Sequence, residues 1–572
     1  MKSRKFFISS ALALSTVLGS VGPMMNAMPI SATAVSIDKG HTDSYVYYQI
    51  FKGTALKNGD NQDNELTNVE WGSHAGENGA RILNAFANAD QDAYPKIAEQ
   101  IKPKVNATTD PKTSAAQLAE LIGGASGCEM EIARLLNDTF VAGNIQGTAV
   151  TSGTTELPDG YYLFKDTKAV GTDTDDVVGL SVLKVADEDI IITPKNDKPT
   201  VDKQVYDNDV HDGEAEAGFG ETADHEIGET FQFRLKATIP NYEAIENYKE
   251  YALTFADTLS KGLTYLGNVK VSIKVGDTGT PTVIYNEGEA AVSNENVTVG
   301  NRETDGKGVT TWNLSIADLM KETSITGITG DQKKAPIYVE VLYDAQLNKD
   351  AIVHSATEDP ATTNSNKVEL IYSNNPNAEG TGKTAPDSVF VFTYGLNNKK
   401  TDVDGVALKD AEFKLFKGTG ASAQYAVFDE DGKFERWANN ESDGTAIKSD
   451  ADGLFKMIGL DAGTYTLKET KAPDGGYKIS GNGTTQITIT ADHNEKSKDA
   501  PILNLSQKEG EKDKENMTDG KELGVTIVNS KISNLPETGG MGTTIFYAAG
   551  GILAAGAVIA LAATKKAKKE ED

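Results

Sequence analysis

Cysteine is almost absent from this 572-residue chain, which contains only Cys128. A single cysteine cannot form an internal disulfide. Disulfide bonds, the usual covalent cross-links of secreted proteins, therefore do not stabilise this chain. Histidine is also scarce, and its six copies are scattered without metal-ligand spacing. We therefore expect no metal site and no cofactor. We expect Cys128 to be a small buried hydrophobe rather than a reactive thiol.

Positive charge is in deficit. The chain has 55 Lys and Arg against 84 Asp and Glu, for a net charge of -29. This balance argues against nucleic acid as a partner and favours a soluble, self-repelling exterior. The length predicts about three or four domains. A nucleotide-binding glycine loop and a convincing nucleophile–base pair are both missing from the sequence, which argues against an enzyme.

The first 34 residues have the composition of a secretory signal peptide. Lys2 opens a basic segment, residues 6–18 are apolar, and Ala32-Thr33-Ala34 offers a cleavage site. We expect the mature chain to be exported and to start near Val35.

The other end of the chain combines three signals in order. The pentapeptide Leu535-Pro536-Glu537-Thr538-Gly539 is followed by the uncharged apolar run 545–563 and then by a lysine-rich tail. The run is just long enough to span a bilayer as a helix, and the lysines would stay on the cytoplasmic side. A plain membrane anchor is the simpler alternative.

This tripartite ending, residues 535–572, resembles the cell-wall sorting signal of Gram-positive surface proteins. In that family a sortase cysteine cuts between the Thr and the Gly and passes the Thr carbonyl to an amine. The resemblance implies sortase and peptidoglycan as partners, and covalent anchoring at the cell wall.

The chain between these ends reads as mainly β. Residues 35–194 form a first domain with strand-like stretches at 45–51 and 160–164. Helices interrupt it, one capped by Ser114 and stopped by Gly123-Gly124, and one over residues 131–136.

Two further domains follow. Pro194 and Pro199 bracket a short extended connector. Alternating strands over 200–377 predict a β-sandwich, and a Gly-rich stretch separates it from a last domain, 388–531. The fold class is therefore mainly β, with tandem immunoglobulin-like or Cna-type β-sandwich domains and helices inserted in the first.

Three Asp-x-Asp-Gly stretches occur in the last domain, and they end in Asp404-Gly405, Asp431-Gly432 and Asp452-Gly453. We interpret them as hairpin turns. The Asp-x-Asp-Gly pattern also occurs in calcium loops, but a full twelve-residue loop with a closing Glu does not fit here.

The last domain resembles the Cna B-type fold of Gram-positive surface proteins, on the motifs 404–415, 463–473 and 528–531. In that family a Lys on the first strand attacks an Asn on the last strand to form an intramolecular isopeptide bond, assisted by a Glu. The matching residues here are Lys400, Asn529 and Glu469. Lys399 is the competing donor, although strand parity favours Lys400.

The chemistry requires these residue types. Desolvation pushes a buried lysine toward the neutral, nucleophilic amine. It pushes a buried carboxyl toward the protonated acid, which can then donate to the amide oxygen and move protons as ammonia leaves. Apolar walls hold the groups in contact and exclude water.

The middle domain resembles the isopeptide-forming domain of fimbrial proteins, on the motifs 200–205, 255–265 and 366–376. The resemblance implies Lys203 as donor, Asp257 as the assisting acid and Asn366 as acceptor. Asn364, two residues away on the same face, stays open as an alternative acceptor.

The connector Ile192-Thr193-Pro194-Lys195-Asn196 resembles the pilin motif of backbone pilins, with Thr193 where that motif has Tyr. In the family the motif's lysine accepts the Thr carbonyl of the next subunit. Lys195 is the matching residue, and Lys198 is a nearby rival. The first domain also resembles the N-terminal pilin domain, through the stretches 40–42, 48–53 and 70–72, but it offers no isopeptide triad that we would name.

The resemblances together imply a shaft subunit of a sortase-assembled surface pilus, in which sortase joins Thr538 of one copy to Lys195 of another. Its partners would be sortase, other copies of itself, minor pilins and peptidoglycan. A wall-anchored monomeric adhesin that binds a host ligand is the alternative and would need no acceptor lysine. A surface enzyme in the first domain is a weaker rival.

Overall fold

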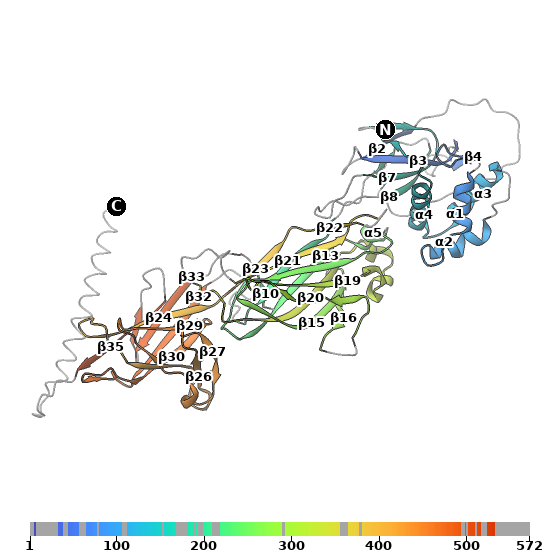
Figure 1. Ribbon diagram of the computed structural model, residues 1–572. Coiled ribbons are helices and arrows are strands. Elements are labelled where there is room, and N and C mark those ends of the chain that lie inside the picture. The colour runs from blue at the N-terminus through green and yellow to red at the C-terminus, as the bar shows by residue number, and fades with distance from the viewer. Residues whose placement is uncertain are drawn as a thin grey trace, which may run out of the picture.

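The structure, a computed structural model, shows three β-rich domains that follow one another in a row along the chain (Figure 1). The predicted mainly-β fold class is confirmed. The structure describes residues 5–6, 33–37, 44–56, 65–76, 79–105, 111–150, 154–167, 180–186, 190–192, 198–208, 218–246, 248–288, 292–354, 364–376, 380–492, 498, 502–509, 512–515 and 523–531.

Several predicted features lie outside these residues. They are the connector lysine Lys195, the sorting pentapeptide 535–539, the apolar run 545–563 and most of the signal peptide. Among the residues that are described, no helix is both long and apolar enough to cross a membrane.

The described residues of the first domain form two sheets and four α-helices. One sheet has the order β1-β9-β2-β6, and the other has the order β4-β3-β7-β8 with β5 beside β3. Their bounds are β1 (Lys5–Phe6), β2 (Thr33–Ile37), β3 (Tyr45–Leu56), β4 (Glu65–Trp71), β5 (Thr148–Ala149), β6 (Thr154–Leu157), β7 (Gly160–Asp166), β8 (Leu180–Val185) and β9 (Ile190–Ile192). The helices are α1 (Ala80–Ala87), α2 (Pro95–Gln100), α3 (Pro111–Gly124) and α4 (Glu129–Ala142).

The helices are longer and more numerous than the sequence indicated. The helix expected from Ser114 begins at Pro111, because proline is suited to the first helical position and Ser114 is buried rather than capping. The helix expected over 131–136 extends through all of α4, whose buried side carries Cys128 at its start. Burial raises the pKa of the Cys128 thiol to about 11, as expected for a packed rather than a reactive cysteine.

The middle domain is a sandwich of two sheets. The first has the order β11 (Phe219–Gly220), β10 (Thr200–Tyr206), β13 (Thr230–Ile239), β20 (Ile337–Leu347), β15 (Leu263–Val275) and β16 (Thr282–Asn286). The second has the order β12 (Thr222–Asp224), β23 (Asp387–Phe392), β21 (Asn364–Ser373), β14 (Leu253–Leu259), β19 (Thr310–Ile316) and β17 (Val297–Val299), with β18 (Glu303–Thr304) and β22 (Thr381–Lys383) at its side. The short helices α5 (Tyr242–Ile245) and α6 (Thr323–Thr326) lie in its loops.

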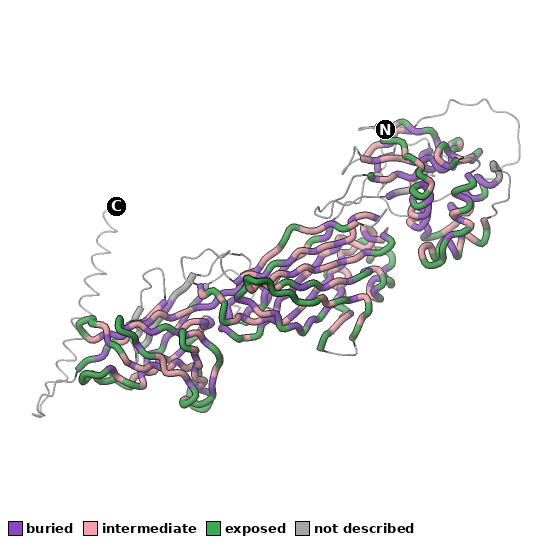
Figure 2. The backbone as a smooth tube through the Cα atoms, in the orientation of Figure 1, coloured by how far each residue is buried: buried purple, intermediate pink, exposed green. Residues whose placement is uncertain are grey.

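Alternation of side chains builds this sandwich. In β14 and β20 every second residue is buried, so one face of each strand lies in the core and the other does not (Figure 2). A polar residue at an inward-facing position of such a strand is therefore buried in the dry interior. The residues of the candidate site lie at such positions.

The C-terminal domain is a second sandwich. Its smaller sheet has the order β29 (Leu454–Leu460), β24 (Tyr394–Asp402), β35 (Thr526–Lys531) and β31 (Tyr477–Lys478). Its larger sheet has the order β27 (Phe434–Ala438), β26 (Gln424–Phe428), β25 (Glu412–Lys417), β30 (Gly463–Lys471), β32 (Thr484–Asp492), β33 (Ile502–Glu509) and β34 (Lys512–Glu515), with β28 (Ile447–Lys448) beside β25. The first and last strands, β24 and β35, pair in parallel.

The structure moves the predicted boundary between these two domains. β22 and β23 lie in the stretch read as a linker and as the start of the last domain, yet both pair with β21 of the middle sandwich. Only Thr393 separates β23 from β24. The last sandwich therefore begins at Tyr394 rather than at residue 388. The Gly-rich composition around β22 hid that strand, and β23, which lies between β12 and β21, was assigned to the wrong sandwich.

The predicted hairpin turns are confirmed. Gly405, Gly432 and Gly453 all have positive φ, between 76° and 81°. In each turn the first Asp accepts two backbone N–H groups through Oδ1, as Asp402 does from Asp404 and Val406. The carboxylates thus stabilise turns.

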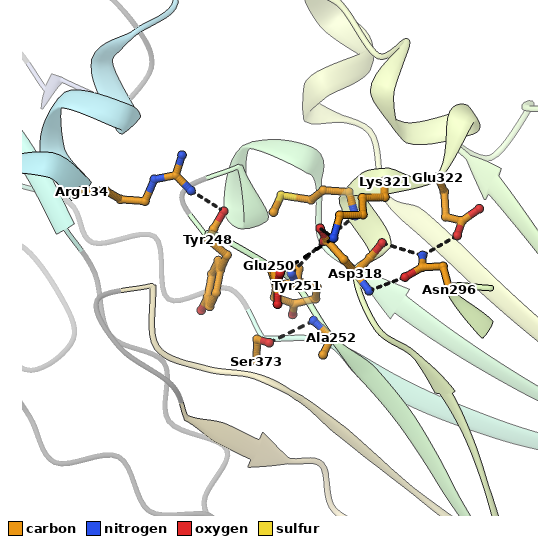
Figure 3. A network of polar contacts seen from close by, with 11 residues as sticks. Arg134, Tyr248, Glu250, Tyr251, Ala252, Asn296, Asp318, Lys321, Glu322 and Ser373 are labelled. Atoms are coloured by element: carbon orange, nitrogen blue, oxygen red, sulfur yellow. Dashed lines mark hydrogen bonds and ion pairs between the residues drawn. The ribbon is translucent and has the colours of Figure 1, made fainter. Parts of the chain in front are cut away.

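The two junctions between domains differ in kind. The buried apolar side chains of the middle and C-terminal domains form one continuous cluster, whereas those of the first domain form clusters of their own. Figure 3 shows the first junction, where Arg134 of α4 donates from Nη1 to the carbonyl of Tyr248 at 2.9 Å. Asp318 braces the adjoining segment by accepting the N–H of Tyr251 at 3.0 Å. A polar contact of this kind restrains a joint less than a shared core does.

Candidate functional site

The C-terminal sandwich buries the three residues that the sequence singled out. Lys400 lies on β24 and Asn529 on its parallel neighbour β35, while Glu469 lies on β30 of the other sheet. Their exposed fractions are 0%, 0% and 4%. Three polar side chains from the two sheets of the sandwich thus meet in its apolar interior.

Some polar atoms of this group form hydrogen bonds, and one buried oxygen has no hydrogen-bond partner among the described residues. Asn529 Nδ2 donates to Glu469 Oε1 at 2.6 Å, and Lys400 Nζ donates to the Ile527 carbonyl at 3.1 Å. The Asn529 Oδ1 atom is buried and has no hydrogen-bond partner among the described residues. Turning the amide over would point this oxygen at Glu469, where a protonated carboxyl could donate to it.

Burial sets the protonation of the pair. It lowers the pKa of Lys400 to about 8, although Glu469 acts in the opposite direction. It also raises the pKa of Glu469, against the effects of Lys400 and of the Asn529 hydrogen bond. Both shifts favour the neutral amine and the neutral acid, which are the forms that amide exchange requires.

The neighbouring lysine is placed differently. Lys399 is exposed, because the parity that sends Leu396, Asn398 and Lys400 inward sends Lys399 to solvent. Of the two competing donors, only Lys400 lies beside Glu469.

The middle sandwich holds a second buried group of the same composition. Lys203 lies on β10 of one sheet, and Asp257 and Asn366 lie on the paired strands β14 and β21 of the other. All three are at most 1% exposed. Lys203 Nζ forms a close ion pair with Asp257 Oδ2.

Burial again opposes charge at this site. It lowers the pKa of Lys203 despite the attraction of Asp257, and it raises the pKa of Asp257 despite Lys203. The Lys203 amine also lies 5.1 Å from the ring centre of Phe233 and 5.5 Å from that of Tyr343, so aromatic walls surround it.

The alternative acceptor in this strand has a different role. Asn364 Oδ1 accepts the N–H of Ile352 at 2.8 Å, and its Nδ2 donates to the carbonyls of Ile352 and Val391, each at 3.0 Å. Its amide therefore holds a loop against the sheet. Asn366 Oδ1, by contrast, is buried without a hydrogen-bond partner among the described residues, as is Asn529 Oδ1.

Sequence reasoning missed Tyr343, which lies at the centre of the middle site. Its hydroxyl donates to Asp257 Oδ1 at 3.0 Å, accepts from Asn366 Nδ2, and lies 3.5 Å from Lys203 Nζ. The inward parity of β20 could have placed this tyrosine in the core. The identity of its partners could not be read from the sequence, because they come from three other strands.

A lysine–asparagine contact also exists in the first domain. Lys165 Nζ donates to Asn137 Oδ1 at 2.9 Å. However, Lys165 is only half-buried and the nearby carboxyl of Asp138 is exposed. The contact thus differs from the two sandwich sites in having no dry acid beside it within the described part of this domain.

The residues proposed for polymerisation are less fully described. Lys195, Leu535, Pro536, Glu537, Thr538 and Gly539 lie outside the described residues. Lys198 is exposed at the entrance to β10.

Family models match three parts of the chain. Residues 227–376 match the Gram-positive pilin backbone subunit 2, Cna-B-like domain, and residues 395–500 match a prealbumin-like fold domain. Residues 527–572 match the LPXTG cell wall anchor motif. The predicted resemblance to Gram-positive backbone pilins is confirmed, and so is the expected location at the cell wall.

The chain is also similar to several known proteins. The chain is 25% identical over 393 residues to the trypsin-resistant surface T6 protein of Streptococcus pyogenes serotype M6, a match that covers 58% of this chain and 64% of that protein. Among solved structures, the T6 backbone pilin of the same serotype aligns with 16% identity and a TM-score of 0.43, covering 81% of this chain and 83% of that one. The pilus 2b backbone protein of group B streptococcus aligns with 20% identity and a TM-score of 0.35, covering 59% and 99%.

We predict a distinctive pH dependence for the Asn529→Ala variant, in which Lys400 must stay a free amine. The folded pKa of Lys400 is about 8 against an ordinary value of 10.5. Between these values the unfolded chain binds more protons, so the free energy of unfolding should rise from pH 8 to pH 10.5, by at most about 3 kcal/mol.

Urea unfolding across this pH range measures the effect. The control is the double variant Lys400→Met with Asn529→Ala, which lacks the titrating amine and should show a shallower slope. Equal slopes for the two proteins would contradict a depressed lysine pKa.

Proposed function

We propose that this chain is the shaft subunit of a covalent surface pilus, hardened from within by two lysine–asparagine isopeptide bonds. One observation carries the proposal: two separate sandwiches each enclose a lysine, a carboxyl group and an asparagine amide in one dry cluster. Burying polar and ionisable groups costs folding free energy. Their burial in both sandwiches therefore indicates that they have a function. The pilin backbone and wall-anchor matches support the same conclusion.

The bonds would form by amide exchange between Lys203 and Asn366 and between Lys400 and Asn529. The neutral amine attacks the side-chain amide carbon, and the assisting acid, Asp257 or Glu469, donates its proton to the amide oxygen. The attacking nitrogen then loses a proton to the departing nitrogen, which leaves as ammonia, and the acid recovers its own proton. One C–N bond forms, one C–N bond breaks, and neither oxidant nor cofactor is needed. The protein would thus modify itself once, without turnover.

The positions of these bonds suit a fibre under tension. Lys400 lies on the first strand of its sandwich and Asn529 on the last, and these strands are parallel neighbours. A pull would therefore pass from β24 to β35 through the bond and bypass residues 401–528. In the middle domain the bond would instead link the first strand, β10, to β21 of the facing sheet, so that a pull would bypass residues 204–365.

The bonds would also stabilise the folded state. Each closes a loop well over a hundred residues long, as the residue numbers show. By analogy with disulfides, such closure contributes on the order of 5 kcal/mol through the unfolded chain. This would replace the disulfides that one cysteine cannot provide.

Polymerisation would join Thr538 of one subunit to Lys195 of the next. Sortase cleavage after Thr538 leaves an acyl group that must meet an unprotonated, accessible amine. In the sequence the connector lies between the first and middle domains, more than three hundred residues before the sorting pentapeptide, and Figure 1 shows the first and C-terminal domains on opposite sides of the middle domain. Head-to-tail linkage through these points would give a linear fibre, and transfer of the last acyl group to peptidoglycan would fix the fibre to the wall.

Intact mass tests the internal bonds. The mature chain should be lighter than its sequence mass by two ammonia molecules, because each bond expels one. Asp257→Asn and Glu469→Gln, which keep the shape but remove the acid, should each restore one ammonia. Lys399→Ala is the matched control and should retain both losses. A wild-type mass equal to the plain sequence mass would exclude the bonds.

Tyr343→Phe tests the residue at the centre of the middle site. Its hydroxyl positions both Asn366 and Asp257, so its removal should slow bond formation by at least ~10-fold. Cell-free synthesis in a Glu469→Gln background, with intact mass followed over time, isolates the middle bond. Tyr338→Phe on the same strand is the control, since its hydroxyl contacts the remote Asp277. Equal rates for both variants would show that Tyr343 is only a wall of the site.

A polymer ladder on a denaturing gel tests assembly in the native host. Lys195→Ala and Lys195→Arg should both abolish the ladder and leave a wall-linked monomer, because arginine offers no usable nucleophile. Lys198→Ala should leave the ladder intact. Loss of the ladder in Lys198→Ala alone would reassign the acceptor to Lys198. A wild-type chain that forms no ladder would favour the monomeric adhesin.

A further inference from the structure

The junction between the middle and C-terminal domains is built around a short turn, residues 225–229, that connects β12 to β13. The N–H of His225 donates to the Phe392 carbonyl at 3.0 Å. The N–H of Ile227 donates to the carbonyl of Gly459, in the other domain, at 3.0 Å. Gly459 must be glycine, because its φ is +87° and a Cβ would lie 2.5 Å from Ile227 Cδ1. The turn is therefore held in place from both domains.

The imidazole of His225 is the most enclosed group of this turn, with an exposed fraction of 1%. Its ring stacks on Phe231 with centroids 4.2 Å apart. Its Nε2 lies 2.8 Å from the carbonyl of Tyr206, which can only accept, so Nε2 carries a hydrogen. In the neutral ring Nδ1 then presents a lone pair.

That lone pair lies close to one carboxylate, and a second carboxylate lies nearby. Nδ1 lies 3.3 Å from Glu229 Oε2. One ring nitrogen of His225 and one oxygen each of Glu229 and Asp461 lie within 4.8 Å of one another. Among the described residues Nδ1 makes no hydrogen bond of acceptable geometry. A lone pair directed at one carboxylate, with a second carboxylate close by in a largely buried place, is unfavourable unless a cation lies between them.

We propose that His225, Glu229 and Asp461 bind a divalent transition-metal ion, with zinc as the representative. One imidazole nitrogen and two carboxylate oxygens suit zinc, whereas calcium and magnesium prefer oxygen ligands alone. The hydrogen bond from the distal ring nitrogen to a backbone carbonyl is the usual second contact of a metal-bound histidine. A dication would also balance the two negative charges that surround the neutral ring.

Such an ion would connect the two domains. His225 and Glu229 belong to the middle sandwich, and Asp461 follows β29 of the C-terminal sandwich. The metal would therefore brace a junction that already shares an apolar core. This proposal concerns that junction alone and does not depend on pilus assembly or on the isopeptide bonds.

The competing explanation is a second proton on His225. Burial lowers the pKa of His225, but Glu229, the Tyr206 carbonyl and the charge of Asp207 together outweigh burial, so the pKa is raised above its ordinary value. A positively charged imidazolium would satisfy Glu229 and Asp461 without any metal. The two explanations differ in whether the site takes up zinc.

Calorimetric titration of the metal-free mature chain with zinc chloride at pH 7.5 distinguishes them. One zinc ion should bind per chain and raise the melting temperature. His225→Gln and Asp461→Asn should each weaken binding at least ~10-fold. Glu435→Gln is the matched control, because its carboxylate lies at the same junction but accepts from Lys349 at 2.6 Å. It should bind zinc like wild type.

Cobalt substitution provides a second, spectroscopic measurement. Cobalt bound in the same site should show the visible absorption of a low-coordinate nitrogen–oxygen complex, and this should vanish in both variants. No zinc uptake by the folded wild type would overturn the proposal in favour of the imidazolium. Uptake that both variants retain, or that only one of them loses, would overturn the three-ligand site. Asp461→Asn keeps the test valid if His225→Gln fails to fold.

Discussion

The burial of a lysine amine beside a carboxyl group and an amide is the constraint on which the rest of this structure depends. Water would keep the amine charged and the acid ionised, so both sandwiches must be closed before the chemistry can occur. The apolar alternation of β14, β20 and β24 achieves this closure, because it puts the polar groups on the inward parity among aliphatic and aromatic side chains. The strong β pattern is thus a condition for the proposed covalent bonds and not only for the fold.

The two sites reach the same end by different routes. In the C-terminal sandwich, donor and acceptor lie on adjacent parallel strands and the acid comes from the opposite sheet. In the middle sandwich, acid and acceptor are adjacent and the lysine crosses from the opposite sheet. Tyr343 links the groups of the middle site. The common requirement is a dry interior that two sheets enclose, and not one particular strand arrangement.

The two junctions between the domains differ in rigidity. The middle and C-terminal sandwiches share a continuous apolar core and the turn at 225–229. This junction is therefore the more rigid of the two. The first domain has its own core and contacts the middle domain through polar groups such as Arg134. In the sequence, the proposed polymerisation lysine falls in the connector between these two domains and outside the described residues.

The sequence by itself determined the mainly-β class, the hairpin turns, the wall-anchor ending and the residues of both buried groups, since these depend on local pattern and motif. Parity also favoured Lys400 over Lys399, because side-chain direction in a strand follows residue number. Only the tertiary structure shows that Asn364 and Asn366, which both face inward, have different surroundings: the Asn364 amide binds backbone groups, and the Asn366 amide lies beside Tyr343. It also revealed Tyr343, the strands hidden before Tyr394, and the meeting of His225 with Asp461. These residues come together from distant strands or from two domains, and no local spacing records a contact that chain folding alone creates.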